Sequence, residues 1–241
     1  MIMEDIIEFD NQEIYGLVYL PDESKNYPFV ILSHGLSLDH SYMQAYAEKL
    51  LKHGIASYIY DFQGGGYDSK STGKICDMTI SSECTDLCRV IEHIKSTYDI
   101  SSLYLAGHSQ GGLVSSLVAS DNPGITDALF LFAPAYEIPD DMIEQPPRQM
   151  NVLNLMPEHL GAKYIDDAKN IKVYEIIKNF NKRVYIFHGQ CDRRVPLSYS
   201  QKASEVFPDC KLICYPDEEH RFTDDTKDDV VEIIADYIYK S

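Results

Sequence analysis

The sequence lacks tryptophan and is poor in basic residues, with 21 Lys and Arg against 38 Asp and Glu. The formal net charge is therefore −17. Nucleic acids and anionic membrane surfaces are bound through basic faces, so this balance argues against both kinds of partner. We expect no nucleic-acid partner and a solvated, acidic surface.

Long hydrophobic runs are absent as well. No apolar stretch approaches the length of a membrane span. The first residues, Met1-Ile-Met-Glu-Asp-Ile-Ile-Glu, lack the basic stretch followed by an apolar stretch that marks a secretory signal. These two absences predict a chain without a membrane span and a cytoplasmic location.

Tight cysteine pairs are also missing. The six cysteines include no C-x-x-C pair, and the nearest neighbours, Cys84 with Cys88 and Cys210 with Cys214, lie four positions apart. A structural zinc site usually needs such pairs, and a disulfide scaffold is typical of much shorter chains. We expect reduced, mostly buried thiols, no metal site and no organic cofactor.

Apolar runs short enough for strands alternate along the chain with segments of helical periodicity. The strand-like runs are residues 29–32, 55–60, 103–106, 128–132, 183–187 and 211–215, and the helix-like segments include 43–53, 80–96, 199–206 and 228–239. This alternation predicts an α/β fold with a mostly parallel sheet and helices on both faces. Before it, residues 5–9 and 14–20 predict an antiparallel pair of strands.

Residues 136–177 break this rhythm. The segment contains four prolines and no clean period, and it is too long for a simple connection. We expect a lid or cap inserted over the strand ends, with residues 1–135 and 178–241 forming the core. An irregular crossover without a function of its own is the alternative.

The pentapeptide Gly107-His108-Ser109-Gln110-Gly111 follows one predicted strand and precedes a helix-compatible segment. A G-x-S-x-G motif in this context is typical of a nucleophile elbow. Small residues are needed two positions before and after the serine, because the turn is so sharp that side chains there would collide. Ser109 is therefore the candidate nucleophile.

A serine hydroxyl needs a histidine as base and a carboxylate to orient that histidine. With an elbow of this kind the acid and then the histidine follow the serine along the chain. Asp192 follows a predicted buried strand and a tight turn, and His220 follows the last predicted strand. We select Asp192 as the acid, with Asp209 and Asp217 in reserve, and His220 as the base.

A tetrahedral intermediate needs two backbone N–H groups directed at its oxyanion. The residue after the nucleophile, Gln110, is expected to supply one of them. The loop after residues 29–32, His34-Gly35-Leu36, can turn closely and is expected to supply the other from Leu36.

Together these residues resemble the α/β-hydrolase superfamily over essentially the whole chain. The matching marks are Ser33-His34-Gly35, Tyr60-Asp61-Phe62-Gln63-Gly64, Gly107-His108-Ser109-Gln110-Gly111-Gly112, His188-Gly189-Gln190-Cys191-Asp192 with Val195-Pro196, and Glu219-His220. The elbow, Ala133-Pro134-Ala135 and the modest insertion look most like the bacterial cinnamoyl or feruloyl esterases.

In those esterases the inserted segment supplies polar groups to the phenolic ring of the substrate. The resemblance implies this role for Asp141 or Asp140, for Gln145, and for Tyr164. The sequence departs from the pattern in two ways. Its insertion is shorter, and Gln63-Gly64-Gly65-Gly66-Tyr67 replaces the common Arg-Gly-His-Gly, which leaves the turn without an arginine that often braces it.

These observations predict a serine hydrolase acting on small-molecule carboxylic esters with small or aromatic acyl groups. A thioesterase, a monoacylglycerol lipase or a small-peptide hydrolase would use the same chemistry. A ligand-binding protein that kept the fold without turnover is the alternative from a different class. The sequence identifies neither the natural substrate nor the oligomeric state. A homodimer is one arrangement that it allows.

Overall fold

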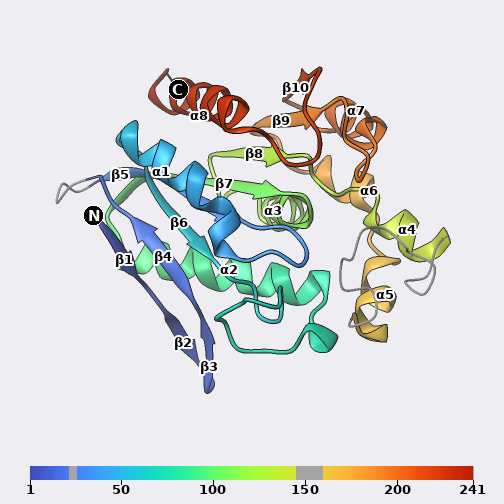
Figure 1. Cartoon of the computed structure of the whole chain (residues 1–241), viewed down its shortest axis with the longest axis horizontal. Coiled ribbons are helices and arrows are strands. Elements are labelled where there is room, and N and C mark those ends of the chain that lie inside the picture. The colour runs from blue at the N-terminus through green and yellow to red at the C-terminus, as the bar shows by residue number, and fades with distance from the viewer. Residues whose placement is uncertain (22–25, 145–159, 241) are drawn as a thin grey trace.

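A computed structural model describes residues 1–21, 26–144 and 160–240 (Figure 1). One sheet of eight strands runs through the molecule in the order β1-β4-β6-β5-β7-β8-β9-β10. The strands are β1 (Ile2–Glu4), β4 (Gly16–Tyr19), β5 (Tyr27–Ser33), β6 (Ala56–Tyr60), β7 (Ile100–His108), β8 (Ala128–Phe132), β9 (Arg183–Gly189) and β10 (Cys210–Tyr215). From β6 to β10 all neighbours are parallel, whereas β1 and β4 pair antiparallel.

The central strands are apolar on both faces. Along β5, Phe29 and Ile31 pack into the core on one side of the sheet, and Val30 and Leu32 pack into the core on the other. Parallel strands covered on both sides read as continuous apolar runs, which is why their positions were visible in the sequence.

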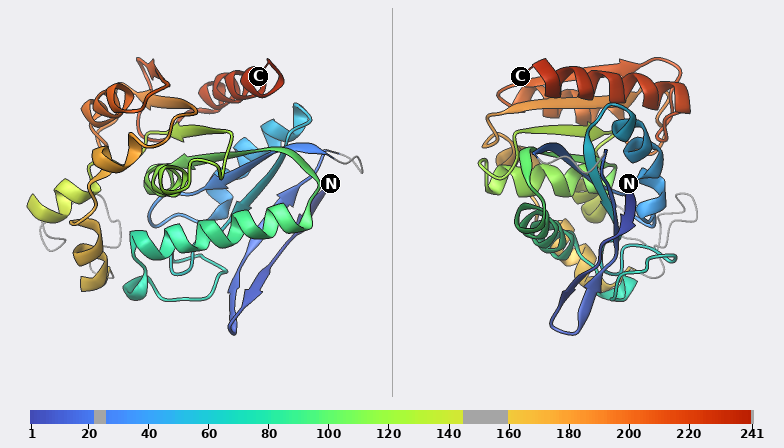
Figure 2. Two further views of the ribbon diagram at one scale, coloured as in Figure 1. Left: turned by 180° about the vertical axis from the view of Figure 1, so that it is seen from behind. Right: turned by 90° about the vertical axis from the view of Figure 1, so that its left-hand side faces the viewer.

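Helices cover both faces, as predicted. Residues of α1 (Gln44–Lys52) and α8 (Asp224–Lys240) form one core with the sheet. On the opposite face the core includes residues of α2 (Ile80–Thr97), α3 (Gln110–Asp121), α6 (Val173–Ile177) and α7 (Leu197–Val206). The right-hand view of Figure 2 shows α8 and α2 on opposite sides of the sheet. No described helix is long and apolar enough to cross a membrane.

The N-terminal strands differ from the prediction. The first hairpin joins β2 (Ile7–Phe9) to β3 (Gln12–Ile14) through Asp10 and Asn11, both at positive φ. The chain then leaves the hairpin, and β4 pairs with β1 and β6 in the large sheet. Strand β1 was missed because its three residues are all exposed and carry no burial pattern.

The segment predicted as an insertion contains short helices that periodicity did not reveal. They are α4 (Ile138–Glu144), α5 (Ala162–Ala168) and α6. In Figure 1, α4 and α5 lie beyond the arrowheads of β7 and β8, while α6 lies against the core with Val173 and Ile177 buried. Helices of five to seven residues are too short to show a period in sequence. The division into core and insertion stays a prediction.

All six cysteines are free thiols. None is fully buried, and Cys76 and Cys191 are exposed, so the expectation of mostly buried thiols was wrong. Cys84 and Cys88 lie on α2, and Cys210 and Cys214 lie on β10, the edge strand of the sheet, so these four are outside the sheet interior.

Candidate active site

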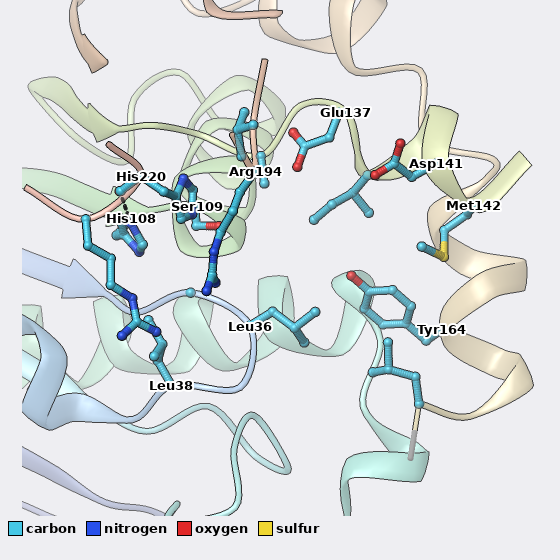
Figure 3. Close-up of a pocket in the computed structure, with 16 residues that line it drawn as sticks. Leu36, Leu38, His108, Ser109, Glu137, Asp141, Met142, Tyr164, Arg194 and His220 are labelled. Atoms are coloured by element: carbon cyan, nitrogen blue, oxygen red, sulfur yellow. Dashed lines mark hydrogen bonds between the residues drawn. The ribbon is translucent and has the colours of Figure 1, made fainter. Parts of the chain in front are cut away.

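The carboxyl ends of the parallel strands bring the predicted residues to one edge of the sheet. Gly35 follows β5, Ser109 follows β7, Asp192 follows β9 and His220 follows β10. Ser109, His220, Gly35 and Leu36 line one pocket (Figure 3). Asp192 lies behind His220, outside the lining.

Ser109 sits on a sharply turned backbone, with φ of 55° between β7 and α3. A Cβ added at Gly107 would lie 2.3 Å from the carbonyl oxygen of Gly111, and one at Gly111 would lie 2.4 Å from that of Ser33. No side chain fits at either glycine, which is the physical reason for the spacing seen in the sequence. The Ser109 N–H donates to the carbonyl of Phe132 at 2.9 Å and fixes the turn to β8.

His220 is paired with the predicted acid. Its Nδ1 lies 2.7 Å from Oδ2 of Asp192. The other carboxylate oxygen, Oδ1, accepts the backbone N–H groups of Arg194 at 2.8 Å and Val195 at 3.0 Å. Burial would raise the pKa of Asp192, but the hydrogen bonds from His188 and His220 outweigh it and hold that pKa well below its ordinary value. The carboxylate is therefore ionised and ready to orient the imidazole.

A second histidine, His188, contacts the same carboxylate. The side chain is fully buried at the end of β9, and Nε2 lies 3.3 Å from Oδ2 of Asp192 and 3.1 Å from the carbonyl oxygen of Val195. Both neighbours are acceptors, so Nε2 carries the proton and Nδ1 accepts the hydroxyl of Ser200 at 2.8 Å. The sequence placed His188 beside the acid turn but gave it no role.

His108 holds the backbone of the predicted base. Its Nε2 donates to the carbonyl of His220 at 3.0 Å, and the two rings lie 4.7 Å apart. Burial, and then the neighbouring His220, hold the pKa of His108 well below its ordinary value. The His108 ring is thus neutral and supports the His220 loop, a role that the elbow motif alone did not indicate.

The two predicted oxyanion donors flank Ser109. A Cβ added at Gly35 would lie 3.0 Å from the Cβ of Ser109, so the loop that carries Leu36 runs directly against the serine. Within the described part of the chain, the backbone N–H groups of Leu36 and Gln110 donate to no other residue. Both groups are available to a ligand at Ser109.

The side chain of Gln110 is fixed on both sides by buried partners. Its Nε2 donates to Oε2 of Glu83 on α2 at 2.8 Å, and its Oε1 accepts the hydroxyl of Tyr164 on α5 at 2.6 Å. Burial raises the pKa of Glu83 to about 8, so this carboxyl is largely protonated at neutral pH. The elbow is thereby joined to α2 and to α5.

The residues implied by the resemblance fall in different places. Asp141 and Tyr164 line the pocket. The hydroxyl of Tyr164 is already bonded to Gln110, so its ring forms a wall. Asp140 accepts the hydroxyl of Tyr199 at 2.9 Å outside the pocket lining. Gln145 lies outside the described residues.

Glu137 also lines the pocket and was missed by the sequence reasoning. The residue is only 7% exposed, and its Oε2 has no hydrogen-bond partner among the described residues. Burial, and then the charges of Asp141 and Asp192, raise the pKa of Glu137 well above its ordinary value. The only available signal was its place two residues after the strand-end motif Ala133-Pro134-Ala135.

The loop that lacks the expected arginine is braced by other groups. Asp61 accepts the backbone N–H of His40 at 2.6 Å, the ring of His40 at 2.8 Å and the backbone N–H of Lys70 at 2.7 Å. In the described ranges, Asp39, His40 and Asp61 place possible metal-ligating atoms within 4.8 Å of one another. Because the carboxylate oxygens of Asp61 already accept these bonds, the cluster serves as a brace.

A parallel sheet with helices on both faces, and a serine on a strained turn at its carboxyl edge, define an α/β-hydrolase. Comparison with protein families narrows this class. The chain belongs to the family described as serine aminopeptidase, S33, whose model matches residues 24–177. The predicted superfamily and fold are confirmed, and the chain is a serine hydrolase by family.

Solved structures with the same fold include one that has ferulic acid bound. This structure is that of Est1E from Butyrivibrio proteoclasticus. It is 27% identical to this chain and has a TM-score of 0.86, and each chain covers 98% of the other. A second structure is that of a monoacylglycerol lipase from Paleococcus ferrophilus, with 17% identity and a TM-score of 0.72. The match covers 93% of this chain and 99% of the lipase chain. This second likeness shows the fold alone.

A curated relative matches by sequence. The monoglyceride lipase homolog of monkeypox virus is 30% identical over 131 residues, which is 54% of this chain. The match spans 46% of the viral protein, so the chain spans about half the length of that relative.

Proposed function

We propose that this protein is a serine carboxylesterase that hydrolyses small or aromatic esters of the cinnamoyl or feruloyl type. The observation that carries the proposal is the 2.7 Å contact between His220 Nδ1 and Asp192, with His220 and Ser109 in one pocket. The family and the feruloyl-binding structural neighbour support the same chemistry.

The reaction proceeds through an acyl-enzyme. His220 Nε2 accepts the proton of Ser109 Oγ as this oxygen attacks the ester carbonyl. The N–H groups of Leu36 and Gln110 stabilise the oxyanion of the tetrahedral intermediate. His220 then donates its proton to the leaving alcohol, and a water molecule activated by the same ring releases the acid. Asp192 stays ionised and stabilises the imidazolium.

The acyl group is assigned to the end of the pocket formed by α4 and α5. Its apolar lining comes from Ile138, Met142 and Leu160, and Tyr164 provides an aromatic wall. A ring hydroxyl there would meet Oε2 of Glu137, which has no hydrogen-bond partner among the described residues. Burial raises the pKa of this carboxyl well above its ordinary value, which favours the protonated form that can both donate and accept. Asp141 is the second candidate for this hydroxyl, and Gln145 keeps the role implied by resemblance.

A monoacylglycerol lipase is the second candidate function. The viral relative favours it, because its printed name is a monoglyceride lipase homolog. The apolar lining at α4 would equally accept an acyl chain. Comparing kcat/KM for methyl hydroxycinnamates with that for monoacylglycerols decides between the two, and we expect the hydroxycinnamates to be the better substrates.

Stopped-flow hydrolysis of a 4-nitrophenyl ester tests the catalytic assignment. The wild-type chain should give a burst of nitrophenolate from acylation of Ser109. Ser109→Ala should abolish the burst and lower steady turnover by about 10³-fold or more. The matched control is Ser101→Ala, at an exposed serine on β7, and it should keep both the burst and the steady turnover. A burst that survives in Ser109→Ala would exclude this nucleophile, and no turnover of any short ester would exclude the esterase.

A further inference from the structure

Two arginines face the pocket beside the predicted triad. Arg194 lies two residues after Asp192, on the loop between β9 and α7, and Arg221 directly follows His220. Both line the pocket together with Ser109. Figure 3 shows the side chain of Arg194 extending into this space.

Neither guanidinium forms an ion pair with any residue that the structure describes, although the chain carries 38 acidic residues. Two other arginines are paired, Arg89 with Asp86 at 3.4 Å and Arg183 with Asp209 at 3.2 Å. Arg221 instead lies over the ring of Tyr42, 5.5 Å from its centroid. Within the described ranges, neither of these two pocket arginines is thus paired with a carboxylate.

The two arginines also act on each other. Burial, and then the charge of Arg221, lower the pKa of Arg194, while Asp192 and Tyr42 act in the opposite direction. Asp192 is engaged with His220 and with two backbone N–H groups. Arg194 is partly buried and Arg221 is exposed. Two like charges that lower each other's stability are unfavourable unless an anion joins them, so the arrangement is suited to a negatively charged ligand.

The position of the two arginines indicates which part of the ester they would contact. In the proposed mechanism His220 protonates the leaving oxygen, so the alcohol part must lie next to the His220 loop. Arg221 belongs to that loop, and Arg194 to the loop of the acid. The acyl part is assigned to the other end, where Glu137, Asp141 and Tyr164 lie (Figure 3).

We propose that Arg194 and Arg221 form an anion subsite, and that preferred substrates carry a carboxylate on the alcohol side of the ester. A guanidinium binds a carboxylate through two parallel hydrogen bonds, which gives both affinity and orientation. The subsite also counters the long-range repulsion that a chain of net charge −17 exerts on an anionic substrate. This inference rests on the proposed esterase function.

A matched pair of acetate esters tests the subsite. In 4-acetoxybenzoate the leaving group carries a carboxylate, and in methyl 4-acetoxybenzoate the same group is masked and neutral. The measured quantity is the ratio of kcat/KM for the charged ester to that for the neutral one. Comparing this ratio between variants cancels the different reactivity of the two leaving groups.

We expect the ratio to fall at least about tenfold in the double variant Arg194→Gln/Arg221→Gln, because each charge-assisted contact is worth about a factor of ten. Arg194→Lys/Arg221→Lys should recover part of it. Arg193→Gln, an exposed arginine on the same loop outside the lining, is the control and should keep the wild-type ratio. Added NaCl should lower the wild-type rate on the charged ester more than on the neutral ester.

The outcomes separate this proposal from the esterase assignment. Turnover of the neutral ester with an unchanged ratio in the double variant would overturn the subsite and leave the esterase standing. If the wild-type chain hydrolyses neither ester, the esterase fails, and calorimetric titration with 4-hydroxybenzoate decides the subsite. Binding lost in the double variant and kept in Arg193→Gln supports it, and equal binding in all three proteins overturns it.

Discussion

At the scale of single residues, Gln110 has two roles, and its position in the sequence indicated only the first of them. Its backbone N–H is the proposed oxyanion donor, while its side chain is fixed between Glu83 and Tyr164. The bonds lie in a buried site, where an unsatisfied polar group is costly. The orientation of the elbow therefore depends on partners from two other helices.

Glu83→Gln should change how stability depends on pH. The folded pKa of Glu83 is raised from 4.5 to about 8 by burial. The unfolded chain then loses this proton at lower pH than the folded chain, and wild-type stability falls by up to about 1.4 kcal/mol per pH unit between these two values. A glutamine can still accept from Gln110 and has no proton to lose.

Thermal unfolding between pH 5 and pH 8 checks this prediction. Glu83→Gln should lose less stability over the range than the wild-type chain, while Glu92→Gln, exposed on the same helix, should follow the wild type. Identical pH slopes in all three proteins would mean that Glu83 is ionised without cost in the fold.

Tyr164→Phe should lower turnover without changing the preference for a ring hydroxyl. The substitution leaves Oε1 of Gln110 unsatisfied, which costs about 1–3 kcal/mol of stability and loosens the elbow. Tyr136→Phe, which removes a hydroxyl bonded to Ser116 away from the pocket, is the control and should keep kcat. The measurement is kcat and KM for methyl cinnamate and for its hydroxylated form. A loss confined to the hydroxylated ester would assign the Tyr164 hydroxyl to the substrate instead.

The sequence was informative about residues whose role follows from local motifs and chain order. Ser109, Asp192 and His220 each follow a predicted strand, so their common edge could be inferred. Glu137 and His188 could not be assigned, because their importance lies in burial and in contacts that no spacing encodes. The hydroxyl of Tyr164 was assigned to the substrate by resemblance, whereas its partner is Gln110.

At the scale of elements, the close approach of β5, β7 and α3 depends on Gly107 and Gly111. Gly111 lies where an added Cβ would be 2.4 Å from the carbonyl oxygens of Ser33 and His34. The end of β5 and the first turn of α3 can touch only because Gly111 places no side chain between them. The long parallel strands were predictable from their apolar runs, but the exposed strand β1 and the short helices α4 and α5 were not.

Gly111→Ala should disrupt the elbow, because the backbone oxygens that it meets cannot move without breaking the sheet edge. We expect a loss of several kcal/mol, within the range of overpacked or strained sites, and loss of turnover. Gly124→Ala is the control, since its nearest atom would be 3.7 Å away. Denaturant unfolding and ester hydrolysis check both variants, and a fully active Gly111→Ala would contradict the contact.

At the scale of the whole molecule, the net charge of −17 makes the surface repel itself. Salt screens such repulsion, so raising NaCl from about 10 mM to about 200 mM at pH 8 should stabilise the fold by about 1 kcal/mol, or roughly 3 °C in Tm. The same series near pH 4.7, the calculated isoelectric point, is the control. A rise of equal size at both pH values would show that screening is not the cause.

The order in which the strands follow one another has a consequence for biosynthesis. The proposed nucleophile lies on the turn after β7, whereas the proposed acid and base follow β9 and β10, the last two strands of the chain. A nascent polypeptide that has emerged from the ribosome only as far as residue 177 can build the elbow but holds neither Asp192 nor His220. Esterase chemistry therefore awaits the final stretch of translation, and a fragment that satisfies the family match over residues 24–177 would be inert.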